Sequence, residues 1–152
     1  MPRSRLIELN AAVRLVLDTN TAISGLLWGG QPGRLIQAAV SGTIELACTT
    51  AMLAELRGVL EREKFVARLS SRGLAVARVF AGYAALVEVV APAEIPPTIE
   101  RDPTDDMVLA AAVGAGASLI VSGDSHLLDL GAFRGIEIVP ASTAVSMIEA
   151  CQ

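Results

Sequence analysis

The sequence predicts an α/β fold with a mainly parallel sheet, because short apolar runs typical of buried strands alternate with longer helical patterns. The five expected strands are Arg14–Leu17, Ile44–Cys48, Val87–Val90, Ser118–Val121 and Ile136–Val139. Hydrophobic residues make up 53% of the 152 residues, and alanine supplies much of that share. Buried parallel strands covered by alanine-rich helices account for such a composition.

Helices are expected between these strands, and several have recognisable ends. Pro32 suits the first turn of a helix that runs to about Val40. Thr49 or Thr50 is an N-cap candidate for a helix that continues through Arg62. The remaining helical segments are Ile23–Trp28 (a single turn), Lys64–Leu69, Leu74–Leu86, Met107–Val113 with a stop at Gly114-Ala115-Gly116, and Pro140–Ala150.

The length fits one domain, residues 1–152, in which residues 1–12 are expected to form a flexible leader. The longest uncharged run, Met107–Gly123, is shorter than the ~18 apolar residues of a membrane span and contains glycines. Charged residues interrupt any signal-like apolar region near the N-terminus. We therefore expect a cytoplasmic protein without a membrane segment.

The reactive residue types are scarce, and this scarcity excludes several kinds of site. Cys48 and Cys151 are far apart and form no CxxC motif, so a structural zinc site or a disulfide framework is not expected. His126 is the only histidine and Lys64 the only lysine, which excludes a histidine-rich metal site. The net charge of −4 gives no global basic signature of nucleic-acid binding.

Acidic residues occur where the predicted strands end and where a predicted helix begins. Asp18 directly follows the first strand, and Asp124 follows the strand Ser118–Val121. Asp105 and Asp106 precede the helical run that leads into the strand Ser118–Val121. Because ligands bind at the carboxyl ends of strands in open α/β sheets, these acids are expected at one edge of the sheet.

Such a cluster, together with Glu55 early in its helix, predicts a site for Mg²⁺ or Mn²⁺, which prefer oxygen ligands. Carboxylates packed closely repel each other unless a cation is bound between them. The expected ligands are Asp18, Asp105 and Asp124, with Asp106 as the alternative to Asp105. Asn20 and Ser122 are expected to support this site by positioning a ligand or a water.

Each acid also has an ordinary structural explanation when it is considered alone. An aspartate after a strand commonly caps a turn. Acids in a first helical turn interact favourably with the helix dipole, which would explain Asp105 and Asp106. Glu55 could pair with Arg57 or Arg62 on the surface of its helix.

Three segments, LVLDTNTAISGLL, TTAMLAELRGVLEREKF and RDPTDDMVLAAAVGAGASLIVSGDSHLL, together resemble the PIN-domain nucleases. They resemble most the branch that contains relatives of the VapC toxins of toxin–antitoxin systems. The resemblance covers nearly the whole chain, from Arg14 to Ile148. It implies a three-layer α/β/α sandwich around a central, mainly parallel sheet of four to five strands. It also implies RNA cleavage that depends on Mg²⁺ or Mn²⁺, a cognate antitoxin and often a homodimer.

The catalytic acids of the family correspond to Asp18 of DTN, to Glu55 and to Asp124 of VSGD. The third family acid is ambiguous, because the family pattern reads roughly Asp-Pro-Asp-Asp-Asn and this chain has RDPTDD. An ungapped comparison assigns the catalytic place to Asp105, and a shift of one residue assigns it to Asp106.

Two other functions stay open at this point. The segment Gly123–Asp129 resembles the late metal motif of haloacid-dehalogenase-like phosphatases, with Asp18 as nucleophile. However, Asn20 occupies the place of the second acid, and the single candidate for the expected lysine is Lys64, within a predicted helix. The other alternative is a PIN-like module that binds RNA or protein without cutting.

Three further features have two interpretations each. The segment Arg57–Arg78 is rich in arginine and could follow an RNA backbone, or it could be a solvated helical surface. Trp28 could stack on a base, or it could anchor the core or a dimer. His126 could contact substrate, but we expect it to belong to a turn or helix cap.

Overall fold

The computed structural model describes residues 13–99 and 103–150 of the chain. The expected leader, residues 1–12, lies outside the described residues, as do Asp102 and Cys151. The described parts form an α/β fold around a six-stranded sheet with the order β3-β2-β1-β4-β6-β5. Neighbouring strands are parallel except at the edge pair β5–β6, which is antiparallel.

The strands confirm the expected positions, and the sheet gains one strand at its edge. The predicted ranges Ile44–Cys48 and Ile136–Val139 match β2 and β6. The additional strand is β5, an edge strand of two residues that was not predicted, whereas the other edge strand, β3, was expected at Val87–Val90. The strands are β1 (Val13–Leu17), β2 (Ile44–Cys48), β3 (Glu88–Val89), β4 (Leu119–Val121), β5 (Ala132–Phe133) and β6 (Ile136–Val139).

Eight helices occur within the described residues. They are α2 (Thr19–Leu27), α3 (Gly30–Val40), α4 (Thr50–Leu60), α5 (Glu63–Ser71), α6 (Val76–Leu86), α7 (Pro103–Ala115), α8 (Ser125–Leu130) and α9 (Ala141–Ala150). The helix α8 was not predicted from the sequence. The predicted turn at Ile23–Trp28 is a full helix that begins at Thr19, because Asp18 caps it. The expected cap at Thr49 is confirmed, since its hydroxyl accepts a hydrogen bond from the Met52 N–H at 3.2 Å.

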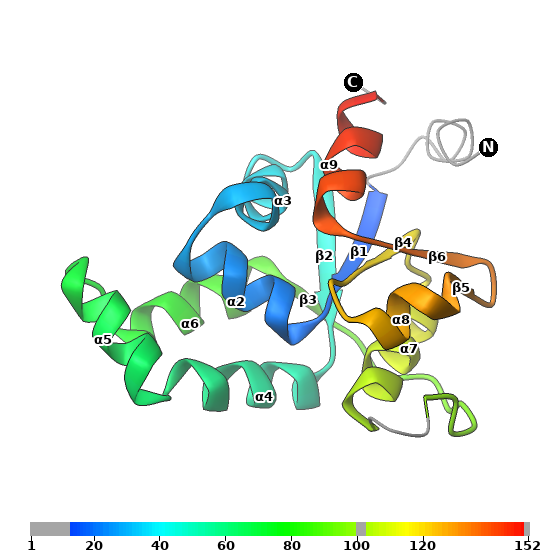
Figure 1. Ribbon diagram of the computed structural model, residues 1–152, viewed down its shortest axis with the longest axis horizontal. Coiled ribbons are helices and arrows are strands. Elements are labelled where there is room, and N and C mark those ends of the chain that lie inside the picture. Colours follow the sequence, from blue (N-terminus) through cyan, green and yellow to red (C-terminus); the bar gives the residue numbers. More distant parts are fainter. Residues whose placement is uncertain (1–12, 100–102, 151–152) are drawn as a thin grey trace.

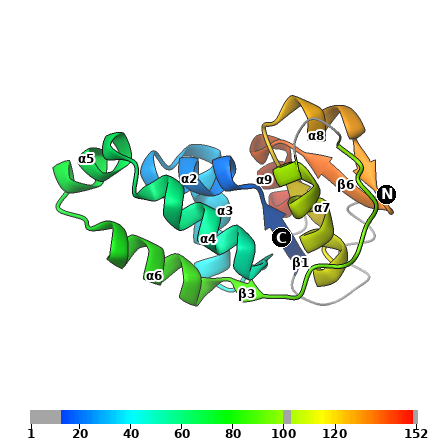
Figure 2. The same ribbon diagram turned by 90° about the horizontal axis from the view of Figure 1, so that it is seen from below.

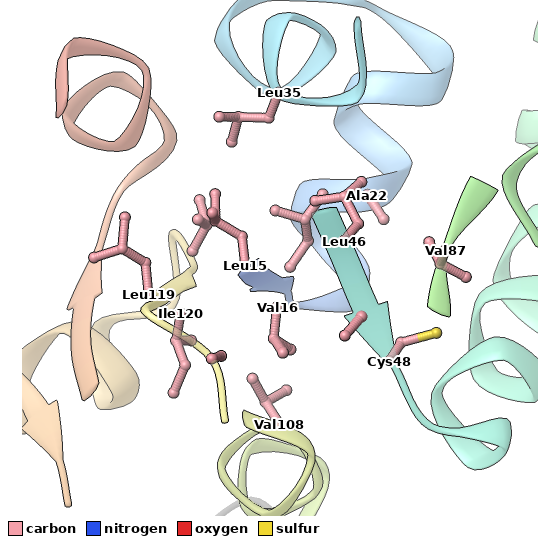
Figure 3. Packing of buried hydrophobic residues seen from close by; sticks show 14 of the residues in the cluster. Leu15, Val16, Ala22, Leu35, Leu46, Cys48, Val87, Val108, Leu119 and Ile120 are labelled. Carbon is pink, nitrogen blue, oxygen red and sulfur yellow. The ribbon is translucent and has the colours of Figure 1, made fainter. Parts of the chain in front are cut away.

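Helices cover both faces of the sheet and give three layers (Figure 1). The helix α7 packs on one face, against β1, β2 and β4, while α3 and α9 pack on the other. Side chains alternate along β1, so that Leu15 points toward Leu35 of α3 and Val16 points toward Val108 of α7 (Figure 3). The helices α2, α4, α5 and α6 extend to one side of this sandwich (Figure 2). No helix in the described part of the chain combines the length and the apolar character needed to cross a membrane.

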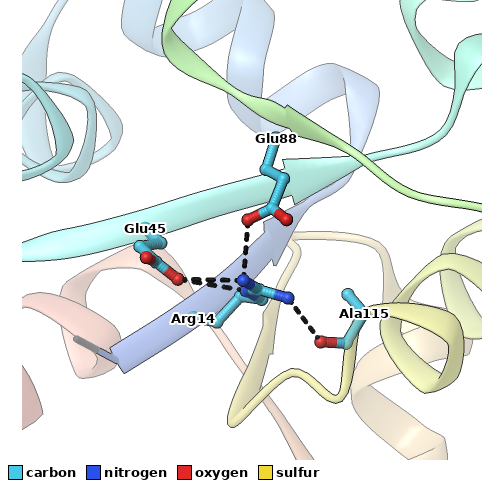
Figure 4. A network of polar contacts seen from close by, with 4 residues as sticks. All are labelled: Arg14, Glu45, Glu88 and Ala115. Atoms are coloured by element: carbon cyan, nitrogen blue, oxygen red, sulfur yellow. Dashed lines mark hydrogen bonds and ion pairs between the residues drawn. The ribbon is translucent and has the colours of Figure 1, made fainter. Parts of the chain in front are cut away.

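A polar network fixes the C-terminal end of α7 on the sheet (Figure 4). The Arg14 guanidinium of β1 forms ion pairs with Glu45 of β2 at 3.1 Å and with Glu88 of β3 at 2.6 Å. It also donates a hydrogen bond to the carbonyl of Ala115 at 2.9 Å, one of the terminal carbonyls that a helix leaves unpaired. A cation is favourable at a helix C-terminus because of the helix dipole. The N-terminal end of α7, which carries Asp105, is thereby held toward the carboxyl ends of the strands.

Candidate metal centre

The sheet has a topological switch point between β1 and β4. From β1 the chain continues to β2 and β3 on one side, whereas β4 and β6 lie on the other side. The connections that leave the carboxyl ends of β1 and β4 therefore diverge and open a crevice, which is where ligands bind in such sheets. Asp18 directly follows β1, and Asp124 follows β4 by three residues. The switch point thus places two of the predicted acids side by side.

Asp18 is buried and held by two hydrogen bonds. It caps α2, because one carboxylate oxygen accepts the backbone N–H of Thr21 at 2.8 Å. Its other oxygen accepts a hydrogen bond from the hydroxyl of Ser122, which is fully buried. Asp18 therefore does cap a helix, as the ordinary explanation required, but it also lines the cavity described below. The two roles are compatible, because each carboxylate oxygen has more than one lone pair.

Ser122 links Asp18 to Asp124. Its oxygen accepts the backbone N–H of Asp124 at 2.9 Å while its hydroxyl donates to Asp18. Asp124 is half-buried and caps α8, since its side chain accepts the N–H of His126 at 2.7 Å. A buried hydroxyl that orients one acid and fixes the backbone of another is typical of the groups that support a metal site.

We expect Ser122→Ala to lower the affinity for Mn²⁺ by about 10–100-fold, the usual cost of losing a group that orients metal ligands. The change removes the donor to Asp18 and the acceptor for the Asp124 N–H. Calorimetric titration with Mn²⁺ measures the effect. Ser41→Ala is the control, because within the described ranges the Ser41 hydroxyl bonds with Ala38 and Thr43, which do not line the cavity. An unchanged Mn²⁺ affinity in Ser122→Ala would remove Ser122 from the site.

All four of the predicted catalytic acids line one cavity of about 60 Å³. They come from four different places: the end of β1, the helix α4, the first turn of α7 and the segment after β4. The predicted supporting residue Asn20 also lines this cavity and is exposed. The lining residues are Asp18, Thr19, Asn20, Met52, Glu55, Thr104, Asp105, Val108 and Asp124.

The structure separates Asp105 from Asp106, which the sequence left ambiguous. Asp105 is buried and lines the cavity. The Asp106 carboxylate accepts the backbone N–H of Ile99 at 2.8 Å and that of Thr98 at 3.2 Å. Successive residues of a helix point about 100° apart, which agrees with Asp105 lining the cavity while the Asp106 carboxylate holds the segment before α7. This arrangement supports Asp105 over Asp106 as the metal ligand, and the choice between them stays a prediction.

His126 lies closer to the acids than the sequence suggested. Potential ligand atoms of Asp105, Asp124 and His126 all lie within 4.8 Å of one another. The backbone of His126 has the capping role that we expected, but its exposed ring also lies near Asp124, with Nδ1 and Oδ1 3.7 Å apart. A contact of His126 with substrate was one of its two interpretations from the sequence, but the short helix α8 that positions the ring was not predicted. Asp18 lines the same cavity but is not part of this tight group.

Glu55 is half-buried at the cavity, and surface pairing does not explain it. Across residues 13–99 and 103–150 it forms no ion pair with Arg57 or Arg62. Arg57 lies 3.9 Å from Glu61 instead. Glu55 therefore faces the other acids without a neutralising arginine.

The donor set fits a hard divalent cation. Four carboxylates line the cavity, and among the residues that the structure describes no arginine or lysine does, so the mutual repulsion of the carboxylates favours binding of a cation. Carboxylate oxygens are the ligands that suit Mg²⁺ and Mn²⁺. The volume is small, about that of two water molecules at ~30 Å³ each. Cys48 does not line the cavity, and burial raises the pKa of its thiol to about 11.

Comparisons with known proteins agree with this geometry. No curated protein matches the chain. The family model of the PIN domain matches residues 14–126, a range that includes all four acids of the cavity. PIN domains are generally nucleases that use divalent metal. Since the match covers most of the sequence, the chain belongs to the PIN-domain family.

Proposed function

We propose that this protein is a cytoplasmic endoribonuclease that depends on Mg²⁺ or Mn²⁺ and acts as the toxin of a toxin–antitoxin pair. The observation that carries the nuclease proposal is the meeting of Asp18, Glu55, Asp105 and Asp124 at one cavity. The toxin role is supported by the resemblance of three segments to the VapC branch. On the basis of that resemblance we also propose an antitoxin that blocks the cavity and a homodimer of the chain.

Each residue of the cavity has a distinct part in the proposed reaction. Asp18, Asp105 and Asp124 would hold the cation, and His126 lies close enough to two of them to contribute a nitrogen ligand. When bound, a divalent cation supplies charge neutralisation for the phosphodiester and makes water more acidic. Glu55 has no arginine partner among the described residues, so it is placed to accept a proton from the attacking water. Asp18 is fixed by Thr21 and Ser122 and needs no rearrangement to act.

Asp18→Asn is expected to abolish metal-dependent cleavage of a mixed single-stranded RNA pool, compared in EDTA, Mg²⁺ and Mn²⁺. Asparagine keeps an acceptor for the Thr21 N–H, so the cap of α2 survives, while the charge and the acceptor for the Ser122 hydroxyl are lost. The same substitution should remove any growth arrest that expression of the wild-type chain causes, which tests the toxin role.

The possible results of that experiment separate the candidate functions. Cleavage that persists both in EDTA and in Asp18→Asn would indicate a contaminating nuclease. Absence of both cleavage and Mn²⁺ binding would favour a PIN-like module that binds without cutting. Trapping an aspartyl-phosphate on Asp18 would favour the phosphatase alternative. That alternative has little structural support, because its required lysine, Lys64, lies on α5 and does not line the cavity.

A further inference from the structure

Half of the cationic residues of this acidic chain lie in one short segment, residues 57–78. This segment has six of the twelve lysine and arginine residues and only two of the sixteen acids, although the chain has a net charge of −4. It includes the end of α4, all of α5 and the start of α6. Its cations are Arg57, Arg62, Lys64, Arg68, Arg72 and Arg78.

Most of this positive charge is not neutralised. Arg57 is the member of the segment that has an acid nearby, Glu61 at 3.9 Å. Elsewhere in the described part of the chain, no carboxylate pairs with Arg62, Lys64, Arg68, Arg72 or Arg78. All of these five except Arg68 are exposed. The segment therefore presents positive charge to solvent, where a polyanion can reach it.

An exposed tryptophan lies against this segment. Trp28, the only tryptophan of the chain, is 53% exposed at the end of α2, so it is not a core residue. The Arg68 guanidinium lies over the indole at 5.0 Å and donates a hydrogen bond to the Leu27 carbonyl at 3.2 Å. Phe65 meets the indole edge-on, with ring centroids 5.9 Å apart, and Lys64 lies over the Phe65 ring at 4.9 Å. These contacts hold the indole of Trp28 in a fixed position beside three residues of α5: the aromatic Phe65 and the cations Lys64 and Arg68.

The helix α2 connects this aromatic cluster to the acid cavity. Residues four apart lie on the same face of a helix, so Asn20, Ser24 and Trp28 form one row along α2. Asn20 lines the acid cavity, and Trp28 lies at the other end of the row. Ten residues separate Asp18 from Trp28, which at a rise of ~1.5 Å per residue is roughly 15 Å. At ~3.4 Å per nucleotide of a stacked strand, that distance corresponds to about four nucleotides.

We propose that Trp28, Phe65, Lys64 and Arg68, here called the stacking surface, bind a single-stranded part of the RNA substrate a few nucleotides from the scissile bond. A base stacks on the Trp28 indole while the cations of α5 contact the phosphates. This combination of aromatic rings and cations is how proteins bind single strands without reading their sequence. The inference rests on the proposed ribonuclease function and adds to it a binding surface that lies outside the acid cavity.

Charge argues against the other natural occupant, a second copy of the chain. A symmetric dimer through this surface would bring the same cations of the two copies together. Like charges placed opposite each other across an interface are unfavourable. An RNA strand, in contrast, supplies the negative charge that the surface lacks.

The fluorescence of Trp28 gives a direct test, because no other tryptophan contributes to the signal. Wild-type protein is titrated in EDTA, where no cleavage is expected, with a short unstructured RNA and with a hairpin of the same length. We expect the single strand to quench Trp28 fluorescence and to bind more tightly than the hairpin. Equal affinity for both RNAs, or binding without a change in fluorescence, would overturn the proposal.

Substitutions of Trp28 and of Lys64 separate stacking from charge. Trp28→Ala should weaken single-strand binding by about tenfold, whereas Trp28→Phe, which keeps an aromatic ring, should lose much less. Lys64→Ala removes an exposed cation that lies over the Phe65 ring and not over the indole, so it should weaken binding and also reduce the dependence of log affinity on log salt by ~0.7, the value for one phosphate contact. Arg34→Ala is the charge-matched control, because Arg34 lies on α3 and pairs with Glu149 at 3.8 Å. Binding by these variants is measured by fluorescence anisotropy of labelled RNA.

The outcomes distinguish this proposal from the proposed function itself. If the wild type cleaves RNA and Trp28→Ala binds the single strand as tightly, the stacking surface is wrong and the nuclease stands. If RNA binds at Trp28 but the metals support no cleavage, the ribonuclease proposal fails and the surface stands. If Trp28→Ala turns a dimer into a monomer without changing RNA affinity, the surface belongs to a second copy of the chain.

Discussion

Replacing Asp105 with asparagine should reduce the rate of RNA cleavage by on the order of 10²–10³-fold, whereas the same change at Asp106 should leave the cleavage chemistry intact. Asp105 is buried and lines the acid cavity. A metal ion stabilises transition-state charge by several kcal/mol, and each ~1.4 kcal/mol corresponds to a tenfold change in rate. Single-turnover cleavage of RNA in saturating Mn²⁺, followed by gel electrophoresis, measures the rate of each variant.

Asp106 is a close control because it is the next residue of the same helix and carries the same charge. Its carboxylate accepts the N–H groups of Thr98 and Ile99, so Asp106→Asn weakens the attachment of the segment that precedes α7. We expect a loss of about 1.5–3 kcal/mol in the free energy of unfolding, the range of hydrogen bonds to a charged group. Equal loss of cleavage in both variants, at concentrations where both are folded, would show that the helix face has been assigned incorrectly.

The pair Asp105 and Asp106 also shows where inference from sequence ends. The resemblance to the family brought the choice down to two adjacent acids, and no pattern of spacing could decide between them. The decision depends on the first turn of α7, which starts at Pro103, earlier than the apolar pattern beginning at Met107 indicated. The partners of Asp106, Thr98 and Ile99, lie in a proline-containing segment without a regular secondary structure from which its path could be read.

The strands and the acids at their ends were predictable for a simpler physical reason. Parallel strands buried on both faces are mainly apolar, so β2 and β6, each with a single glutamate, are visible in the sequence with their correct bounds. Asp18 follows its strand directly, and Asp124 follows β4 by three residues. In contrast, α8 has six residues and β5 has two, too few to establish a hydrophobic period. The proximity of His126 to the acids depends on α8 and was therefore missed.

The Gly114-Ala115-Gly116 segment was expected to end its helix. In the structure Gly116 ends the helix, and Gly114 has a different role. Gly116 follows the last residue of α7 with a φ of +62°, a conformation that favours glycine at a helix end. Gly114 still lies within α7. A Cβ at Gly114 would lie 2.1 Å from the carbonyl oxygen of Ala91, and the neighbouring Ala93 N–H donates to the Ala110 carbonyl at 3.0 Å. Gly114 therefore lets the segment after β3 cross α7 at close range.

Gly114→Ala should accordingly destabilise the protein by about 3 kcal/mol, at the upper end of the usual cost of overpacking, because the obstructing atoms belong to backbone. Gly82→Ala is the matched control: Gly82 lies in the middle of α6, and a Cβ there would meet no atom within 4 Å. Since alanine favours helix, that change should stabilise by about 0.5–1 kcal/mol. Urea unfolding followed by circular dichroism compares the two variants.

Opposite signs for the changes in stability of these two variants would support the close crossing at Gly114. This crossing also affects the acid cavity, for the following reason. The segment that passes Gly114 continues to Thr98 and Ile99, whose amides hold Asp106 next to Asp105. A displacement at Gly114 can therefore reach the first turn of α7, and folded Gly114→Ala protein should bind Mn²⁺ more weakly than Gly82→Ala protein. If both variants are stabilised, the segment cannot cross α7 where the structure places it. In that case the position of Asp105 in the cavity would lose the support that this crossing provides.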